Sequence, residues 1–360
     1  MLWQREIMGG ISVVRVWTYV TANEGFLKRS LDYFSFAITA AIGGLFLPRP
    51  DVIVATSPQI FTALGGCILA WVKRRPFVFE LRDLWPDSIV AVGAMRDGLL
   101  LRMLKRLEYG LYHRAEKIVS VTNAFKRILV TNGVPQEKIA VVRNGVDLKA
   151  FVPGPKPAEL ARRLGLVGKF VAAYVGTIGM AHGLDSLLSA AERLRGRRDL
   201  SFVLVGTGAE RARLEGEAKR RGLDNVMFVG TVDKEGVKEY WRLCDVALVL
   251  LKDVPMFHHV IPSKMFEAMG TGRPIILGVS GESKDLLQES GAGIAIAPED
   301  PQALAEVLTR LMDNPVLCRD MGAAGREFAE RRFDRHGLAL EMLKVLEEAI
   351  EPRCRSGVQA

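Results

Sequence analysis

The chain has 360 residues, of which 49% are hydrophobic and 25% charged, with 35 glycines and 16 prolines spread along the sequence. This composition excludes disordered, collagen-like and low-complexity chains, and the length predicts two domains, since a domain typically has about 100 to 200 residues. Lys and Arg outnumber Asp and Glu by 49 to 41, a net charge of +8, which favours an acidic partner such as nucleic acid, anionic lipid or a phosphorylated substrate.

The cysteines and the apolar stretches bear on the compartment. Cys67, Cys244, Cys318 and Cys354 lie too far apart for a C-x-x-C site, and nothing before them has the pattern of a secretory signal, so we expect a cytoplasmic protein. The uncharged stretch at residues 33–47 is shorter than the about 20 residues of a membrane-spanning helix. The histidines show no H-E-x-x-H spacing, and we expect no metal site.

Apolar runs rich in Val, Ile and Phe alternate with segments of helical period, as in strands joined by crossover helices in a parallel sheet. In the first half the expected strands are SVVRVWTY, DVIVATS, FVFEL, KIVSVT and IAVVRNG. The expected helices are residues 25–47, 59–73, 98–114 and 123–131. Pro153, Pro155 and Pro157 then break the pattern, and we place an interdomain linker over residues 149–169.

A second strand and helix series follows the linker. Its expected strands are FVAAYVG, LSFVLVG, VMFVG, VALVLL, PIILG and GIAIA. The expected helices are residues 184–195, 209–221, 237–243, 262–269, 284–289, 303–312, 315–332 and 337–350. The fold class is therefore α/β with two doubly wound, Rossmann-like domains that face a cleft: residues 1–152, residues 168–332, and a C-terminal helix at 333–351 that packs back on the first domain.

Glycines follow the first two strands of the second domain. Gly176, Gly179 and Gly183 in YVGTIGMAHG, like Gly206 and Gly208 in LVGTG, let the backbone approach a ligand next to a helix N-terminus, which suits a phosphate. The spacing is not G-x-G-x-x-G, and such glycines are equally often only structural.

The segment IPSKMFE is the sharper pattern. Pro262 and Ser263 begin a helix whose first amides, with Lys264, suit a diphosphate, and Glu267 one turn later suits ribose or sugar hydroxyls. Together they predict a site for a nucleotide sugar. The alternative is a surface ion pair between Lys264 and Glu267.

Charged and aromatic residues cluster after a strand of the first domain. FVFELRDLWPDS places Glu80, Arg82, Asp83 and Trp85 at its carboxyl end, where Trp85 could stack on a sugar ring. The alternatives are an ion-paired loop for Arg82 and Asp83 and a simple plug for Trp85.

The first domain also combines basic residues with apolar stretches at 34–47 and 60–72, a combination that suits anionic lipid. The alternative is that the stretches are helices packed on the sheet and that the charges are only solvated. The basic residues are Lys28, Arg29, Lys73, Arg74, Arg75, Arg102, Lys105, Arg106 and Arg114.

Seven segments carry a family resemblance: RPDVIVATSP, FVFELRDLWPDS, RNGVDLKAF, YVGTIGMAHGLDSLL, FVLVGTGAER, VMFVGTV and IPSKMFEAMGTGRPII. Through them the chain resembles glycosyltransferase family 4, the retaining GT-B glycosyltransferases, and in particular enzymes of the colanic acid and O-antigen fucosamine-transferase type. The resemblance covers nearly the whole chain. It implies transfer of a sugar from a nucleotide diphosphate sugar, UDP-linked in our expectation, with retained anomeric configuration and without a metal ion or other cofactor. It also implies a polyprenyl-diphosphate-linked sugar or glycan acceptor at the inner face of the plasma membrane, and no nucleic-acid partner.

The resemblance further implies roles for single residues. Glu267 matches the second glutamate of the family's Glu, seven residues, Glu pattern and would hold the ribose, but His259 stands eight positions earlier, where the first glutamate is expected. Thr177 and His182 stand where the family often has Arg and Lys for the diphosphate, so Lys264 would be the substitute cation. The full donor set is Gly176, Thr177, Gly179, Gly206, Gly208, His259, Ile261, Pro262, Ser263, Lys264 and Glu267; the catalytic set is Arg82, Asp83 and Glu267; the acceptor set is Glu80, Trp85 and Asn144.

The chain departs from the family at its start, MLWQREIMGGISVVRVW, which matches a position well inside such proteins. The family's first strand, glycine-rich acceptor loop, helix and second strand are not seen, so we expect a truncated N-terminus, and Gly9 and Gly10 to form a turn. The alternatives to a transferase are a nucleotide-sugar epimerase of the same architecture and an inactive, membrane-binding fragment. A nicotinamide dehydrogenase is disfavoured, because no G-x-G-x-x-G follows a strand.

Overall fold

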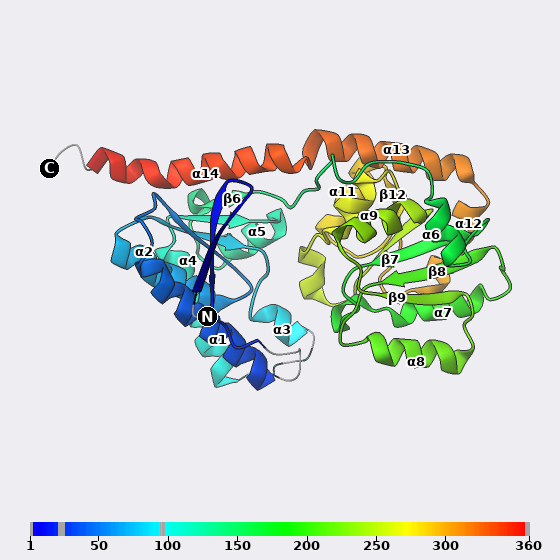
Figure 1. Cartoon of the computed structure of the whole chain (residues 1–360), viewed down its shortest axis with the longest axis horizontal. Coiled ribbons are helices and arrows are strands. Elements are labelled where there is room, and N and C mark those ends of the chain that lie inside the picture. Colours follow the sequence, from blue (N-terminus) through cyan, green and yellow to red (C-terminus); the bar gives the residue numbers. More distant parts are fainter. Residues whose placement is uncertain (1–2, 21–25, 92, 94, 96–97, 357–360) are drawn as a thin grey trace. The chain divides into compact units, whose positions relative to one another are not determined.

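The computed structural model describes residues 3–20, 26–91, 93, 95 and 98–356, without the side chains of residues 26–30 and 352–356. The chain divides into two compact units (Figure 1). The first unit contains the chain up to Val142 together with the segment from Leu340 onward, and the second unit is Arg143–Ala339. Parallel sheets with helices between their strands confirm the predicted α/β class.

The first unit is built on a four-stranded parallel sheet of order β3-β4-β5-β6. Its strands are short and apolar, and Val78, Phe79 and Ile118 are fully buried. The strands are β3 (Ile53–Thr56), β4 (Phe77–Leu81), β5 (Lys117–Ser120) and β6 (Ile139–Val141). The helices are α1 (Phe26–Leu45), α2 (Ile60–Lys73), α3 (Asp87–Ala91), α4 (Leu99–Arg114), α5 (Asn123–Thr131) and the 3₁₀ turn η1 (Gln136–Lys138).

The prediction of a parallel strand over residues 12–19 was wrong. Residues 11–16 form β2 (Ile11–Val16), which among the described residues pairs with β1 (Trp3–Met8) alone, in an antiparallel hairpin that is dark blue in Figure 1. Gly9 and Gly10 form the turn at φ +56° and +84°, the left-handed conformation that two-residue hairpin turns require. An alternating apolar pattern fits a hairpin strand as well as a strand of the parallel sheet, so the pattern alone could not decide.

The second unit is a six-stranded parallel sheet of order β12-β11-β10-β7-β8-β9. The chain passes from β7 outward to β9 and then returns to the other side of β7, so the topological switch point lies between β7 and β10. Open α/β sheets bind ligands at the carboxyl end of this point. The strands are β7 (Phe170–Val175), β8 (Leu200–Val205), β9 (Val226–Gly230), β10 (Val246–Leu250), β11 (Ile275–Gly278) and β12 (Gly293–Ala295).

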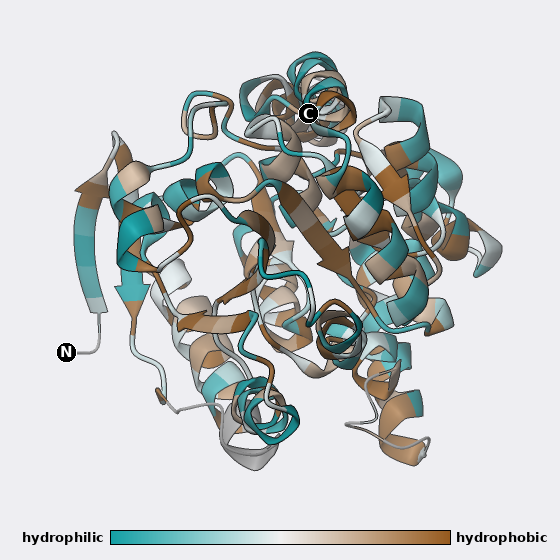
Figure 2. Ribbon diagram, turned by 90° about the vertical axis from the view of Figure 1, so that its right-hand side faces the viewer, coloured by the Kyte–Doolittle hydropathy of each residue, from teal (hydrophilic) through white to brown (hydrophobic). Residues whose placement is uncertain are grey.

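Helices cover the second sheet and bury its four central strands almost completely, whereas the edge strands β9 and β12 are partly exposed. Figure 2 shows brown strands beside helices that alternate brown and teal along their length, the pattern of helices with one apolar face. The helices are α6 (Ala158–Arg163), α7 (Asp185–Arg193), α8 (Arg211–Arg221), α9 (Lys234–Leu243), α10 (Lys264–Gly270), α11 (Glu282–Ser290), α12 (Pro301–Met312) and α13 (Pro315–Arg332), with 3₁₀ turns η2 (Met180–His182) and η3 (Pro255–His259).

The two units divide earlier in the chain than the proline-rich segment suggested. Arg143 donates a hydrogen bond to Glu282 (2.9 Å) and Val146 bridges to Asp334, so residues from 143 onward pack on the second unit. The predicted linker at 149–169 contains α6 and belongs to this unit. The last helix, α14 (Arg335–Ser356), begins in the second unit and continues into the first, where Val345 and Ala349 pack against the β-sheet.

Within the described residues, none of the helices combines the length and the apolar character that crossing a membrane demands.

Candidate functional site

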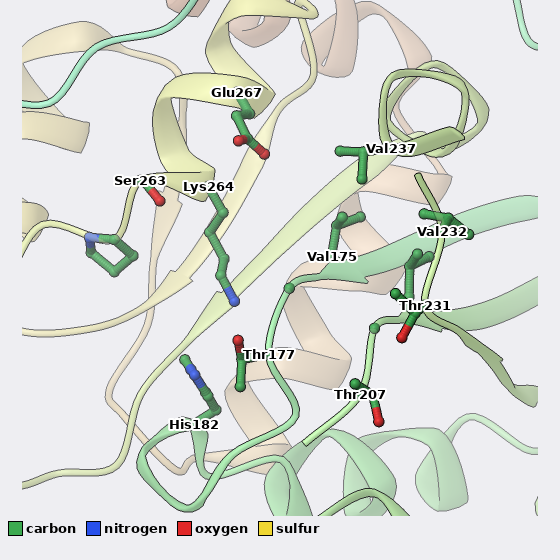
Figure 3. A pocket seen from close by; sticks show the side chains of 14 residues that line it. Val175, Thr177, His182, Thr207, Thr231, Val232, Val237, Ser263, Lys264 and Glu267 are labelled. Atoms are coloured by element: carbon green, nitrogen blue, oxygen red, sulfur yellow. The ribbon is translucent and has the colours of Figure 1, made fainter. Parts of the chain in front are cut away.

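A cavity of about 520 Å³ opens at the carboxyl ends of β7 and β8, beside the switch point of the second sheet (Figure 3). The loops after β7, β8 and β9 line one side of the cavity, and the first residues of α10 line the other. The lining residues are Val175, Gly176, Thr177, His182, Val205, Gly206, Thr207, Thr231, Val232, Val237, Pro262, Ser263, Lys264 and Glu267.

Two glycine loops form the floor of the cavity and are joined through their backbones. The amide of Gly176 donates to the carbonyl of Val205 (2.9 Å), and the amide of Ile178 donates to that of Thr207 (2.9 Å). Gly206 has φ +137°, and a Cβ atom built on it would lie 2.0 Å from the carbonyl oxygen of Gly176. Only glycine therefore fits at position 206, and the floor presents backbone rather than side chains to a ligand.

The ammonium group of Lys264 is the dominant charge of the cavity. Its Nζ atom is buried, makes no hydrogen bond to the described residues, and lies 3.7 Å from the ring centroid of Tyr174. Burial lowers the pKa of Lys264 to about 7, and the carboxylate of Glu267 opposes this only in part. A cation held without an acceptor in a cavity is a site for an anion, because an anionic ligand supplies the missing hydrogen bonds.

The carboxylate of Glu267 lies one helical turn beyond Lys264 and is positioned by Trp241. The fully buried indole of Trp241 donates from Nε1 to Oε2 of Glu267 (2.9 Å). Burial raises the pKa of Glu267, and the bond from Trp241 opposes this rise. Because Trp241 occupies one carboxylate oxygen, the other oxygen is available to accept hydrogen bonds from hydroxyl groups of a ligand.

His182 completes the polar lining close to Lys264. Burial, together with the positive charge of Lys264, lowers the pKa of His182 to about 3, so the imidazole is neutral at physiological pH. Its ring lies against Tyr174 with centroids 5.8 Å apart, and its Nδ1 atom is buried without a hydrogen-bond partner in the described structure. The cavity therefore offers one cation, one carboxylate and one neutral imidazole.

Two family models match nearly all of the chain. Residues 2–145 match the glycosyl transferase 4-like domain, and residues 158–328 match the glycosyl transferases group 1. The chain belongs to the GT-B glycosyltransferases. It is thus an enzyme that transfers a sugar, and its second unit carries the group 1 model together with the cavity.

Individual relatives agree with this family. Over 349 residues the chain is 26% identical to the colanic acid biosynthesis glycosyl transferase WcaI of Escherichia coli K12, with 93% of this chain and 84% of that protein covered. The fold is similar to sucrose-phosphate synthase from Thermosynechococcus elongatus, with a TM-score of 0.78 and 21% identity over 98% of this chain and 86% of that one. It is also similar to Anabaena HepE in complex with UDP-glucose, with a TM-score of 0.73 and 19% identity over 90% and 84% of the two chains.

The structure of this glycosyltransferase brings most of the predicted donor residues to the cavity. Seven of them line it: Gly176, Thr177, Gly206, Pro262, Ser263, Lys264 and Glu267. Lys264 and Glu267 form no surface ion pair, since both point into the cavity (Figure 3). Four others are not among the lining residues: Gly179 at the start of η2, Gly208 beside the backbone of Ile178, His259 at the end of η3, and buried Ile261.

Several lining residues were not assigned to the donor from the sequence. Thr231 and Val232 follow β9 in the segment VMFVGTV, whose strand-end position was the available indication. In the sequence His182 marks only a departure from the family. Trp241 is not a lining residue but donates to Glu267, and it has no local sequence signal, because it reaches Glu267 from another helix.

The predicted residues of the first unit surround the end of β4. Ser57 Oγ accepts hydrogen bonds from the amides of Arg82 (2.8 Å) and Asp83 (3.0 Å), which fixes this loop on β3. Arg82 is exposed and forms no ion pair with Asp83 within the described residues, and burial raises the pKa of Asp83. Glu80 lies within β4, and Trp85 is partly buried after it.

The sequence predicts Asn144 in the acceptor-side first domain, but in the structure it belongs to the second unit. It follows Arg143, which binds Glu282, and both belong to the second unit. The described residues contain no group of three or more His, Cys, Asp or Glu side chains that could hold a metal ion.

The close packing of Gly206 against the Gly176 backbone leads to a prediction about stability. Gly206→Ala should lower the free energy of unfolding by roughly 3 kcal/mol or more, because the added methyl group meets the Gly176 carbonyl and the backbone must move. The control is Gly216→Ala inside α8, where nothing lies within 4 Å and a gain of about 1 kcal/mol is expected. Urea denaturation of both variants measures this, and equal stabilities would refute the clash.

The lowered pKa of Lys264 leads to a second prediction, about how stability depends on pH. Its pKa is lower in the folded than in the unfolded chain, so the unfolded chain binds the proton first as the pH falls from about 10 to 7, and stability is lost over that window. Lys264→Met should therefore raise the melting temperature, most at pH 6 and least near pH 10. Exposed Lys219→Met is the matched control and should show no such trend. A Lys264→Met variant that melts below the parent at pH 6 would contradict the buried, unpartnered cation.

Proposed function

We propose that this glycosyltransferase takes a sugar from a nucleoside diphosphate sugar, UDP-linked in the first instance, and transfers it with retained anomeric configuration. The observation that carries the proposal is the buried ammonium of Lys264, which faces a cavity without a hydrogen-bond acceptor in the described structure. A diphosphate supplies acceptor oxygens and negative charge at this point. The UDP-glucose complex of Anabaena HepE, which has a similar fold, supports the choice of nucleotide.

The rest of the cavity suits the other parts of such a donor. The glycine floor lets a diphosphate approach the backbone closely, and the oxygen of Glu267 that Trp241 leaves available can accept from ribose hydroxyls. His182 is neutral, so it can bind a sugar hydroxyl without adding a charge beside Lys264.

The reaction breaks the bond between the anomeric carbon and the diphosphate oxygen. Positive charge develops on the sugar and negative charge grows on the leaving phosphate. In the proposed mechanism Lys264 stabilises the leaving group, aided by the backbone amide of Ser263 and by those of Thr177 and Gly179, since the amides of Gly176 and Ile178 already donate to the second glycine loop. Arg82 and Asp83 keep their predicted role near the acceptor, and no covalent nucleophile is assigned.

We propose that the acceptor is a growing cell-surface polysaccharide, on a polyprenyl-diphosphate carrier at the inner face of the plasma membrane. Support comes from the relative WcaI, named for colanic acid biosynthesis. An anionic membrane is then a partner, which the basic residues of the first unit favour. The reaction is proposed to need no metal ion.

Turnover with nucleotide sugars tests the proposal. Purified protein is incubated with UDP-glucose, UDP-N-acetylglucosamine or GDP-mannose and a membrane extract, and release of nucleoside diphosphate is followed, with the anomeric configuration of the product determined by NMR. Lys264→Met should lower kcat/KM on the order of a hundredfold, because the leaving group loses its cation, whereas Lys219→Met should match the parent. An epimerised free nucleotide sugar, formed without an acceptor, would instead support the epimerase.

Trp241 gives a test of the carboxylate. Trp241→Phe removes the hydrogen bond that holds Glu267, and KM for the nucleotide sugar should rise roughly tenfold with a smaller change in kcat. Glu267→Gln should raise KM in the same way. In the Glu267→Gln background the Trp241 substitution should add little, because both act through one contact. Additive effects in the double variant would show that Trp241 acts only by packing.

A further inference from the structure

The carboxyl end of α9 carries Trp241, the residue that positions Glu267. The last carbonyl groups of a helix have no partner within the helix and need donors from elsewhere. In α9 the amide of Cys244 donates to the carbonyl of Tyr240 (3.2 Å), so the carbonyls of Trp241 and Arg242 lie beyond this last helical hydrogen bond. The position of Trp241 therefore depends on the groups that bind these two carbonyls.

The guanidinium group of Arg273 binds both carbonyls. Its Nε atom donates to the carbonyl of Trp241 (3.2 Å), and its Nη2 atom donates to that of Arg242 (2.7 Å). Nη2 also donates to the carbonyl of Gly154 (2.9 Å), in the proline-rich segment before α6. A positive charge at the carboxyl end of a helix is favourable as well, because it lies at the negative end of the helix dipole. The side chain of Arg273 thus holds the last turn of α9 in place.

Arg273 is itself fixed by the end of α10. Its amide donates to the carbonyl of Ala268 (2.9 Å), and the preceding Gly272 has φ +67°, the left-handed conformation in which many helices end. The backbone of Arg273 therefore closes α10, which carries Glu267, while its side chain closes α9, which carries Trp241. The two helices are joined at one residue, and their side chains meet again where the Trp241 indole donates to Glu267.

The contacts of Arg273 separate its effect from a direct one on the ligand. Arg273 is not among the residues that line the cavity. Burial raises the pKa of Glu267, and this rise is opposed by the hydrogen bond from Trp241 and by the charges of Lys264 and Arg335. The charge of Arg273 has no part in this balance. Its route to the carboxylate is the position of Trp241.

We propose that Arg273 is a positioning residue for donor binding: it fixes the last turn of α9, so that Trp241 holds the Glu267 carboxylate in the orientation that the donor meets. The inference rests on the proposed function in that Glu267 binds the ribose hydroxyls. Arginine suits this place better than lysine, because its planar group donates in several fixed directions at once, whereas an ammonium acts as a point charge.

The indole N–H signal of Trp241 tests this positioning without any ligand. It is observed by NMR in the full chain with ¹⁵N-labelled tryptophan and is assigned by its loss in Trp241→Phe. The variants are Arg273→Ala and Arg273→Lys. The control is Arg326→Ala, because Arg326 donates to the carbonyls of Gly270 (2.6 Å) and Phe151 (2.7 Å), at the end of the same α10, and its described hydrogen bonds reach no residue of α9.

In Arg273→Ala the proton signal should move upfield, since the indole loses its hydrogen bond to the carboxylate, and in Arg273→Lys it should move less. Arg326→Ala should keep the signal of the parent even though its melting temperature falls. A parent-like signal in folded Arg273→Ala, or an equal movement in Arg326→Ala, would overturn the inference. Arg273→Lys keeps a cation at the helix end and provides the same reading if the alanine variant does not fold.

Kinetics with UDP-glucose supply the second reading. Arg273→Ala should raise KM about fivefold and change kcat less than about twofold, while Arg326→Ala keeps the KM of the parent. In the Trp241→Phe background Arg273→Ala should raise KM by less than about twofold, because both act through one contact, and full additivity would contradict the proposed route. If the parent does not bind UDP-glucose but the indole signal moves as expected, the proposed donor fails and the positioning role of Arg273 stands.

Discussion

The structure of the site depends on one constraint, a buried ammonium group without a hydrogen-bond acceptor among the residues that the structure describes. Lys264 projects from α10 over the ring of Tyr174, and its Nζ atom lies 3.2 Å from where a Cβ atom of residue 176 would be. A side chain at that position would therefore meet the ammonium. Gly176 and Lys264 therefore depend on each other. Because residue 176 has no side chain, the backbone there can approach a ligand closely, and the space beside it holds the ammonium group.

The same constraint explains how neighbouring groups titrate. The charge of Lys264 adds to burial in keeping His182 neutral, while Glu267, a turn away, partly restores the lysine's own basicity. Folding tolerates this arrangement because the surrounding strands are almost fully buried and supply stability elsewhere. A polar cavity that costs stability and is surrounded by a well-packed sheet is typical of a binding site, where a ligand satisfies the groups that folding leaves without partners.

The sequence predicted the elements of the second unit well, because its strands are uniformly apolar and its helices are amphipathic. It failed at residues 11–16 and at the domain boundary. In both places the outcome depends on distant contacts: pairing with β1, and the bridge from Val146 to Asp334. Within the site, Lys264 and Glu267 were predictable because they share one short helix. Trp241 and Thr231 were not, since only the folded sheet brings α9 and the loop after β9 to α10.

The two units differ in how many large apolar side chains they leave exposed, and this difference bears on function. The second unit encloses its strands in helices and keeps its main unpaired charge inside a cavity. The first unit is built on a smaller, four-stranded sheet and leaves large apolar side chains of α1, α2 and α4, and arginines of α4, on its surface. The proposed transfer from a small charged donor to a larger acceptor would use both kinds of surface, because a polar cavity gives specificity for the donor and an open surface can meet a bulky partner.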